Sequence, residues 1–304
     1  MKHFFNLIRY KNLLMIALMQ YLIKYALLEP FGVASALNAF SFSLLTIATI
    51  CIAAAGNVIN DIYDVETDFV NKPDKIIIDK HITEKTAYNM FIALNAIGVS
   101  AGFYVSLQVN RSSFFALFVI ISALLYIYAT YLKRSLLIGN IVISVLVSLS
   151  IIIVGIFDLI PAITTQNRST QFVFFKILMD YTYFAFIINL IREIAKDIED
   201  INGDYKSGMN TLPIAIGRNR AHKILFGLSI IPLFTTIYYI TNTLYKNEIA
   251  VIYFLIFIVA PLFYLCIKIY TAKTTLDYKH ISNILKLVML FGMLSLLLYK
   301  YILL

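Results

Sequence analysis

The sequence predicts an all-α integral membrane protein, and three properties of the chain support that prediction. Of its 304 residues, 61% are hydrophobic and only 14% are charged, whereas soluble domains are closer to half apolar and a quarter charged. The mean hydropathy is +0.83. Apolar runs such as FFALFVIISALLYIYATYL approach the roughly 20 residues that a helix needs to cross a bilayer. No polar block is long enough for a separate soluble domain, so a single domain is expected over 1–304.

Hydropathy along the chain predicts about nine membrane spans, in the order 12–29, 40–60, 87–108, 114–132, 136–157, 172–192, 222–241, 248–268 and 283–303. The first apolar run has no small-residue cleavage site after it, so we expect a retained span rather than a signal peptide. Two connections are long and charged, at 61–86 and 193–221, and the connection at 269–282 is moderately basic.

The distribution of positive charge predicts an orientation. With the N-terminus in the cytoplasm, 19 of the 25 Lys and Arg residues fall on the cytoplasmic side, four on the outer side, and two within or at the edge of spans. This bias satisfies the positive-inside rule, and an odd number of spans leaves the C-terminus outside. The net charge of +8 therefore reflects membrane topology rather than nucleic-acid binding.

One acidic pattern occurs twice in the charged connections, as DIYDVETD at 61–68 and DIEDINGD at 197–204. Because a helix turns about 100° per residue, the three aspartates of each copy fall on one helical face. Asn57 falls in the first arc, Asn60 borders it, and Glu193 joins the second. Four predicted spans separate the copies, so both are expected on the cytoplasmic side.

The acidic residues are concentrated where a bound cation would be needed. Seven of the 17 lie within 61–86 and five within 193–204. Carboxylates on one helical face repel one another, and a divalent cation relieves that repulsion. Oxygen ligands without His or Cys favour Mg²⁺, which keeps some waters and bridges to phosphate oxygens. The pattern therefore predicts Mg²⁺ and a diphosphate, although a solvated charged loop is the simpler alternative.

Basic and aromatic residues near the acidic segments complete the predicted site. A polyanionic ligand would be held partly by metal and partly by cations, for which the candidates are Lys72, Lys133, Arg192, Lys196 and Lys206. Tyrosines in the spans mostly serve packing or face lipid. Tyr126, Tyr128 and Tyr131 are candidates for stabilising a carbocation.

Two segments identify a family resemblance. NVINDIYDVETDFVNKPDK resembles the first signature of the UbiA superfamily of intramembrane prenyltransferases, and REIAKDIEDINGDYKSGMNTLPIAIG resembles the second. LIRYKN and YLKRSLLIGN are weaker echoes. The resemblance implies a nine-helix bundle around a central cavity with cytoplasmic cap loops. It also implies Mg²⁺-dependent transfer of a polyprenyl group from its diphosphate to a lipophilic acceptor.

The resemblance also implies roles for individual residues. The metal ligands would be Asn60, Asp61, Asp64, Asp68, Asp197, Asp200 and Asp204, with Asp64, Asp200 and Asp204 as catalytic residues. Lys133 and Arg192 are similar to diphosphate contacts. Weaker candidates for the cavity or acceptor are Arg9, Asn12, Asn57, Tyr131 and Asn140.

Several functional interpretations stay open at this point. The second segment looks closest to the branch that makes digeranylgeranylglyceryl phosphate, which implies geranylgeranyl transfer to the hydroxyl of geranylgeranylglycerol phosphate. An aromatic acceptor of the quinone, homogentisate or chlorophyll type is the alternative. A divalent-cation transporter and a noncatalytic assembly protein are more distant, because the acids lie at span ends on one side only. The expected location is a bacterial or archaeal cell membrane, with the active site on the cytoplasmic side.

Overall fold

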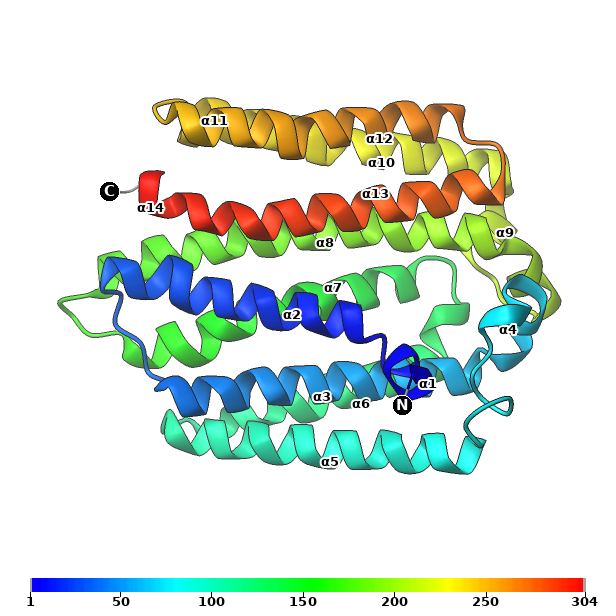
Figure 1. The fold of residues 1–304 in the computed structure, drawn as a ribbon, viewed down its shortest axis with the longest axis horizontal. Coiled ribbons are helices and arrows are strands. Elements are labelled where there is room, and N and C mark those ends of the chain that lie inside the picture. The colour runs from blue at the N-terminus through cyan, green and yellow to red at the C-terminus, as the bar shows by residue number, and fades with distance from the viewer. Residues whose placement is uncertain (1, 303–304) are drawn as a thin grey trace. The chain divides into compact units, whose positions relative to one another are not determined.

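The computed structural model describes residues 2–302, and these residues are almost entirely helical (Figure 1). The α-helices are α1 Lys2–Leu7, α2 Tyr10–Leu22, α3 Ala39–Tyr63, α4 Val65–Asn71, α5 Glu84–Gln108, α6 Phe115–Thr130, α7 Ile138–Val154, α8 Arg168–Lys206, α9 Leu212–Ile216, α10 Arg218–Tyr239, α11 Glu248–Phe254, α12 Ala260–Thr271, α13 Thr275–Leu294 and α14 Tyr299–Ile302. Extended pairing within this part of the chain is limited to an isolated bridge between Ile78 and Ile82.

Nine helical stretches among the described residues are long and apolar enough to cross a membrane, which confirms the predicted number. They are Tyr10–Phe31, Ala39–Tyr63, Glu84–Gln108, Ser112–Thr130, Ile138–Ala162, Arg168–Lys206, Arg218–Leu244, Glu248–Thr271 and Thr275–Tyr301. Several spans are extended by π-helical turns, at Ile23–Leu28, Gly155–Leu159, Ile240–Leu244 and Leu255–Val259. The chain is an integral membrane protein of the all-α class.

The sixth span differs from its predicted end at residue 192, because α8 continues without a break to Lys206. Ile194, Ala195 and Ile198 are fully buried in an apolar cluster, so one face of this charged stretch packs like a core helix. A Schellman motif ends α8: Met209 N–H donates to Asp204 O, Gly208 N–H donates to Tyr205 O, and Gly208 adopts a φ of +67°. The second acidic segment is therefore helical rather than part of a loop.

The first acidic segment is interrupted where a single helical arc was expected. α3 ends at Tyr63 and α4 begins at Val65, with Asp64 between them at φ −98° and ψ −1°. The backbone N–H of Asp68 still donates to Asp64 O, at 2.7 Å. Asp61 therefore lies on α3, Asp64 at the junction, and Asp68 on α4.

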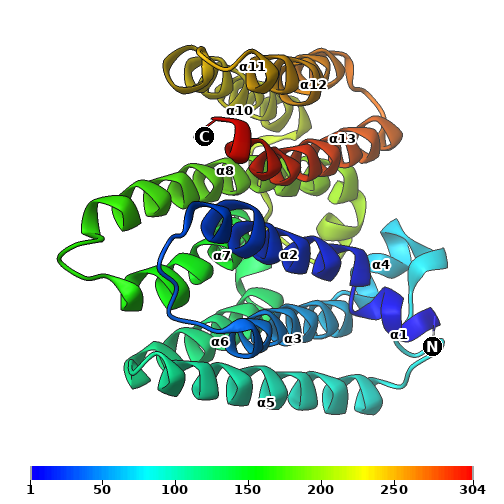
Figure 2. The same ribbon diagram turned by 60° about the vertical axis from the view of Figure 1, so that its left-hand side comes forward.

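The described residues form two compact units. Unit 1 comprises the chain up to Tyr21, Gly32–Lys133 and Leu149–Met179. In it, α3, α5 and α6 run side by side in both views (Figures 1 and 2). Two α5 glycines permit the close approach, because a Cβ at Gly98 would lie 2.7 Å from Ile52 Cγ1 and one at Gly102 would overlap the Phe118 ring.

Unit 2 comprises Leu22–Phe31, Arg134–Ser148 and the chain from Asp180 onward. Its core joins the second half of α8 to α10, α12 and α13, through fully buried residues that include Ile191, Leu225, Leu262 and Leu285. The three helices α10, α12 and α13 lie together in Figures 1 and 2. This packing fixes the α8 segment that carries the second acidic motif.

Candidate functional site

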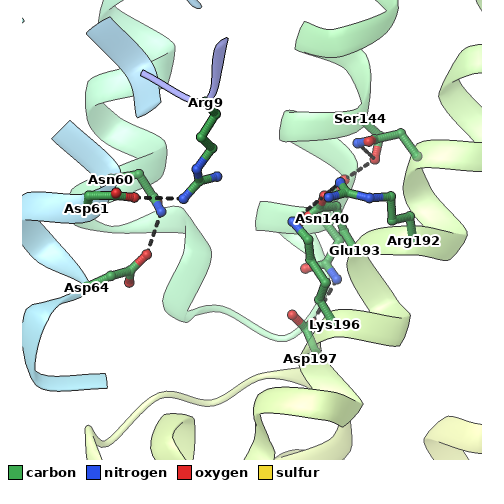
Figure 3. A network of polar contacts seen from close by, with 11 residues as sticks. Arg9, Asn60, Asp61, Asp64, Asn140, Ser144, Arg192, Glu193, Lys196 and Asp197 are labelled. Atoms are coloured by element: carbon green, nitrogen blue, oxygen red, sulfur yellow. Dashed lines mark hydrogen bonds and ion pairs between the residues drawn. The ribbon is translucent and has the colours of Figure 1, made fainter. Parts of the chain in front are cut away.

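The first acidic cluster begins in the last turn of α3, where Asp61 forms an ion pair with Arg9. Arg9 Nη2 donates to Asp61 Oδ1 at 2.7 Å, across 52 residues of sequence. Arg9 lies between α1 and α2 with a φ of +54°, in the left-handed region that few non-glycine residues adopt. Asn57 Nδ2 donates at 2.9 Å to the backbone carbonyl of Ile8, the residue before Arg9. The N-terminal segment is thus attached to the first motif at two points (Figure 3 shows the Arg9 contact).

Asp64 has two partners of different kinds. Asn60 Nδ2 donates to Asp64 Oδ2, and Lys133 Nζ donates to Asp64 Oδ1, both at 2.5 Å. The Lys133 side chain is only 7% exposed and that of Asp64 is 20% exposed. Lys133 lies in the short 3₁₀ turn Leu132–Arg134 that follows α6. The structure therefore joins three predicted site residues, Asn60 and Asp64 of the first motif and Lys133 from the turn after α6.

One oxygen of this cluster has no hydrogen-bond partner among the residues that the structure describes. It is the buried Asn60 Oδ1, whereas the Nδ2 of the same amide is bonded to Asp64. A buried acceptor without a donor costs about 1–3 kcal/mol, so such atoms commonly mark a place for a ligand or ion. The donor set is carboxylate and amide oxygen only, which fits a hard divalent cation such as Mg²⁺.

The other candidates of unit 1 differ in their position in the chain and in their solvent exposure. Asp68 and Lys72 are half-buried, on α4 and at its C-terminal end. Asn12 is half-buried in the first turn of α2, where its backbone N–H donates to Arg9 O. Tyr131 is 79% exposed at the end of α6. The predicted roles of these four residues stay predictions.

The second acidic cluster is organised around Asp197. Asn140 Nδ2, from the first turn of α7, donates to Asp197 Oδ2 at 2.7 Å. Ser144 Oγ donates to Asn140 O at 2.5 Å, and Asn189 Nδ2 donates to Ser144 Oγ at 3.3 Å. A buried polar chain thus runs from Asn189 through α7 to the Asp197 carboxylate. Figure 3 shows Ser144, Asn140 and Asp197 of this chain. The polar chain fixes where that carboxylate points.

Two predicted anion-binding cations converge on Glu193, one turn before Asp197. Arg192 Nη1 donates to Glu193 Oε1 at 2.8 Å, and Lys196 Nζ donates to both Glu193 oxygens at 3.0 and 3.1 Å (Figure 3). The Arg192 and Glu193 side chains are each 12% exposed and that of Lys196 is 29% exposed. Arg192 Nε is buried and has no acceptor within residues 2–302.

The remaining second-motif candidates lie toward the end of α8. Asp200 is half-buried, Asp204 is buried at 6% exposure, and Lys206 is exposed as the last residue of the helix. Downstream, Thr211 precedes α9, and its buried hydroxyl has no hydrogen-bond partner in the described part of the chain.

Metal ligation by the acidic residues stays a prediction. Within residues 2–302, no three His, Cys, Asp or Glu side chains are grouped so that they could hold a metal ion together. In unit 1 the carboxylates of Asp61 and Asp64 are instead each paired with a cation.

Sequence reasoning missed Ser144 and Asn189. The available signal was the i, i+4 spacing of polar residues within apolar spans, at Asn140–Ser144 and at Asn189–Glu193–Asp197. The sequence places Glu193 in the same helical arc as the aspartates. Its spacing does not show that Arg192 and Lys196 both donate to the Glu193 carboxylate.

Comparisons with known proteins show the family to which the chain is similar. The model of the UbiA prenyltransferase family matches residues 17–293. A relative named digeranylgeranylglyceryl phosphate synthase from Korarchaeum cryptofilum is 31% identical over 80% of this chain and 80% of its own length. A protein of the same name from Methanosphaera stadtmanae is 30% identical over 72% of this chain and 74% of its own length.

Solved structures share the fold at lower identity. A structure described as that of digeranylgeranylglyceryl phosphate synthase superposes with a TM-score of 0.64 at 21% identity, covering 98% of both chains. A UbiA homologue from Archaeoglobus fulgidus bound to GPP and Mg²⁺ superposes with a TM-score of 0.59 at 17% identity, covering 97% of this chain and 99% of the other. The match over most of the chain, with these relatives, makes this protein a member of the UbiA prenyltransferase family.

Proposed function

We propose that this chain transfers a geranylgeranyl group from its diphosphate to the hydroxyl of geranylgeranylglycerol phosphate, in a Mg²⁺-dependent reaction. The names of the curated relatives support the pair of substrates. The observation that carries the proposal for the site is the cluster of Asn60, Asp64 and Lys133, in which a buried amide oxygen lacks a partner. Membership of a prenyltransferase family favours this function over cation transport.

We assign one Mg²⁺ site to each acidic segment. In the first, the ligands would be Asn60, Asp61, Asp64 and Asp68, and in the second Asp197, Asp200 and Asp204. When bound, Mg²⁺ supplies positive charge that stabilises the leaving diphosphate. Asp64, Asp200 and Asp204 are the catalytic residues of this proposal.

The cations that pair with the first cluster have a second task in this proposal. Lys133, which pairs with Asp64 in this structure, would donate to the donor diphosphate when Mg²⁺ supplies the positive charge at Asp64. Lys72, at the C-terminal end of α4, and Lys206, the last residue of α8, are further candidate contacts of the diphosphate. Charge-assisted hydrogen bonds of this kind are about twice as strong as neutral ones, so they orient the leaving group as well as stabilising it.

The chemistry requires a cleaved bond, a formed bond and a transferred proton. The allylic C–O bond of the donor breaks and its electron pair leaves with the diphosphate. The acceptor hydroxyl oxygen then forms the new C–O bond and releases its proton to a carboxylate or to the diphosphate. The apolar spans exclude water, which would otherwise capture the allylic carbon and give simple hydrolysis.

The topology proposed for this reaction places the acidic segments on the cytoplasmic side of a bacterial or archaeal cell membrane. The 19 to four distribution of basic residues supports it, as does the even number of spans between the segments. The nine spans then leave the C-terminus outside.

The test is an assay in liposomes with radiolabelled geranylgeranyl diphosphate. Geranylgeranylglycerol phosphate is offered beside a panel of aromatic acceptors, with Mg²⁺ or with EDTA. The expected result is a labelled ether product with the glycerol phosphate only, lost in EDTA and restored by excess Mg²⁺. A product formed only with an aromatic acceptor would overturn the acceptor assignment and move the enzyme to the quinone or pigment branch.

Variants test the site in the same assay. Asp64→Ala and Asp200→Ala are each expected to abolish transfer. Glu66→Gln is the matched control, because Glu66 lies in the same acidic segment, is exposed and is no proposed ligand. Transfer that survives either aspartate change would rule out the metal assignment.

A further inference from the structure

Arg192, Glu193 and Lys196 form a cation pair held together by one acid. Glu193 accepts from Arg192 Nη1 at 2.8 Å and from Lys196 Nζ at 3.0 and 3.1 Å. Two positive side chains this close repel each other, and the shared carboxylate offsets that repulsion. The trio keeps a net charge of +1 and is mostly withdrawn from solvent. Such a trio suits a strongly charged anion.

Arg192 also retains an unused donor. Its Nε is buried and has no acceptor among the described residues. An unpaired buried N–H is destabilising, and more so when the group is charged, so an acceptor from a ligand is expected there. The guanidinium plane presents its remaining N–H groups as a fork that matches phosphate oxygens.

The trio lies on α8 at the start of the second motif, with Lys196 directly before Asp197. Glu193 lies four residues, or one turn, before Asp197 and seven residues before Asp200. With a rise of 1.5 Å per residue, these separations are about 6 Å and about 10 Å along the helix. Asp197 has its own partner in Asn140, whereas Arg192 and Lys196 share Glu193.

The proposed reaction brings two phosphate-bearing substrates together. The donor diphosphate is assigned to metal, Lys133 and neighbouring lysines. The acceptor phosphate is separated by only two carbon atoms from the hydroxyl that reacts. Two polyanions held close together require separate sets of cations, because their mutual repulsion in a poorly solvated site is large.

We propose that Arg192 and Lys196, positioned by Glu193, bind the phosphate of the acceptor. This inference rests on the proposed function, and it takes both cations out of the diphosphate-binding set predicted from the sequence. Glu193 is a positioning residue that touches no substrate. The subsite would accept a phosphomonoester and discriminate against an acceptor that ends in a free hydroxyl.

The test compares Arg192→Gln, Lys196→Met and Glu193→Gln with the natural protein. KM is measured separately for geranylgeranylglycerol phosphate and for geranylgeranyl diphosphate. Each variant is expected to raise the acceptor KM about tenfold or more, as for loss of one charge-assisted hydrogen bond, and to leave the donor KM within about twofold. Arg192→Lys should recover part of the loss. Asn202→Ala, an exposed change on the same helix, is the control.

A binding measurement in EDTA gives a readout that is independent of turnover. The natural protein is expected to bind radiolabelled geranylgeranylglycerol phosphate more tightly than geranylgeranylglycerol, and the three variants to lose that preference. A rise in the donor KM with an unchanged acceptor KM would assign the cations to the diphosphate and overturn the inference. If the natural protein makes no ether with geranylgeranylglycerol phosphate, the proposed function itself fails. A donor KM that can be measured with another acceptor distinguishes that failure from a failure of the inference about Arg192 and Lys196.

Discussion

The guanidinium of Arg9 and the carboxylate of Asp61 lie 2.7 Å apart, and the arginine reaches that position from a left-handed backbone conformation with a φ of +54°. The pair closes 52 residues of chain between the N-terminal segment and the first acidic motif. Asn57 adds a second contact between the same segments, a hydrogen bond from its side-chain amide to the backbone carbonyl of Ile8. The N-terminal segment thus depends on the motif for its attachment, and the motif depends on it for charge balance.

The conformation of Arg9 gives the first prediction. Arg9→Ala and Arg9→Gly both remove the ion pair, but only alanine must adopt the left-handed conformation with a Cβ. Arg9→Ala should therefore be less stable than Arg9→Gly by about 1 kcal/mol. Thermal unfolding in detergent measures the difference. Equal stabilities would mean that the segment rearranges when the pair is lost.

The second prediction concerns Lys133. Lys133→Met leaves the Asp64 carboxylate, which is 20% exposed, without its cation and should cost about 2 kcal/mol of stability. Mg²⁺ should recover much of this loss, because a metal bound at Asp64 replaces the missing charge. Unfolding temperatures in EDTA and in Mg²⁺ test this, with the exposed Lys85→Met as control. A deficit that is the same in both buffers argues against metal at Asp64.

The third prediction concerns Asn140, which donates to Asp197 Oδ2 at 2.7 Å. Asn140→Leu frees the carboxylate to rotate, and loss of such outer hydrogen bonds typically weakens metal binding about 10- to 100-fold. The Mg²⁺ concentration for half-maximal transfer should rise accordingly. Ser148→Ala, on the same helix but bonded only locally to Val145 O, should leave it unchanged. An unaltered Mg²⁺ titration in Asn140→Leu would remove Asn140 from the site.

The fourth prediction is a pH dependence at the N-terminal segment. The rings of His3 and His81 stack with centroids 3.8 Å apart. Partial desolvation and the neighbouring His81 lower the pKa of His3 below its usual 6.5. A lowered pKa means that the docked segment binds protons less readily than the free one. The contact is therefore stable above about pH 6.5 and weakens as the pH falls through the folded pKa.

The absence of tryptophan from the sequence makes this measurable. Phe5→Trp, at an exposed position of α1, supplies a single fluorescent reporter. Its emission should shift below about pH 6.5, the usual histidine value. The shift should disappear in His81→Phe, which keeps a stacked ring without a titrating group. Persistence of the shift in that variant would attribute it to another residue.

The fifth prediction concerns packing within unit 1. Gly102→Ala forces a Cβ onto the buried Phe118 ring and should cost about 1–3 kcal/mol of stability. Gly227→Ala is the matched control, because no atom lies within 4 Å of its Cβ position and alanine favours a helix. Thermal unfolding should therefore separate the two variants in opposite directions. Similar behaviour would mean that α5 shifts away from α6 without cost.

Much of the fold follows from local properties of the sequence. The number of spans is set by apolar runs of sufficient length, and all nine predicted runs coincide with helices among the described residues. Local hydropathy predicts the end of a span incorrectly where charged residues continue the helix. α8 passes its predicted end at 192 because Ile194 and Ile198 pack against other helices of unit 2, which local hydropathy does not register.

The sequence by itself determined the membrane class, the two acidic segments and the residue types of the site, because each depends on composition or on spacing within one helix. Only the tertiary structure decided the partners. Lys133 meets Asp64 across 69 residues, and Asn140 meets Asp197 across 57. Such pairs depend on how separate helices pack, so no local pattern encodes them. The structure likewise shows that Arg192 and Lys196 both donate to the carboxylate of Glu193.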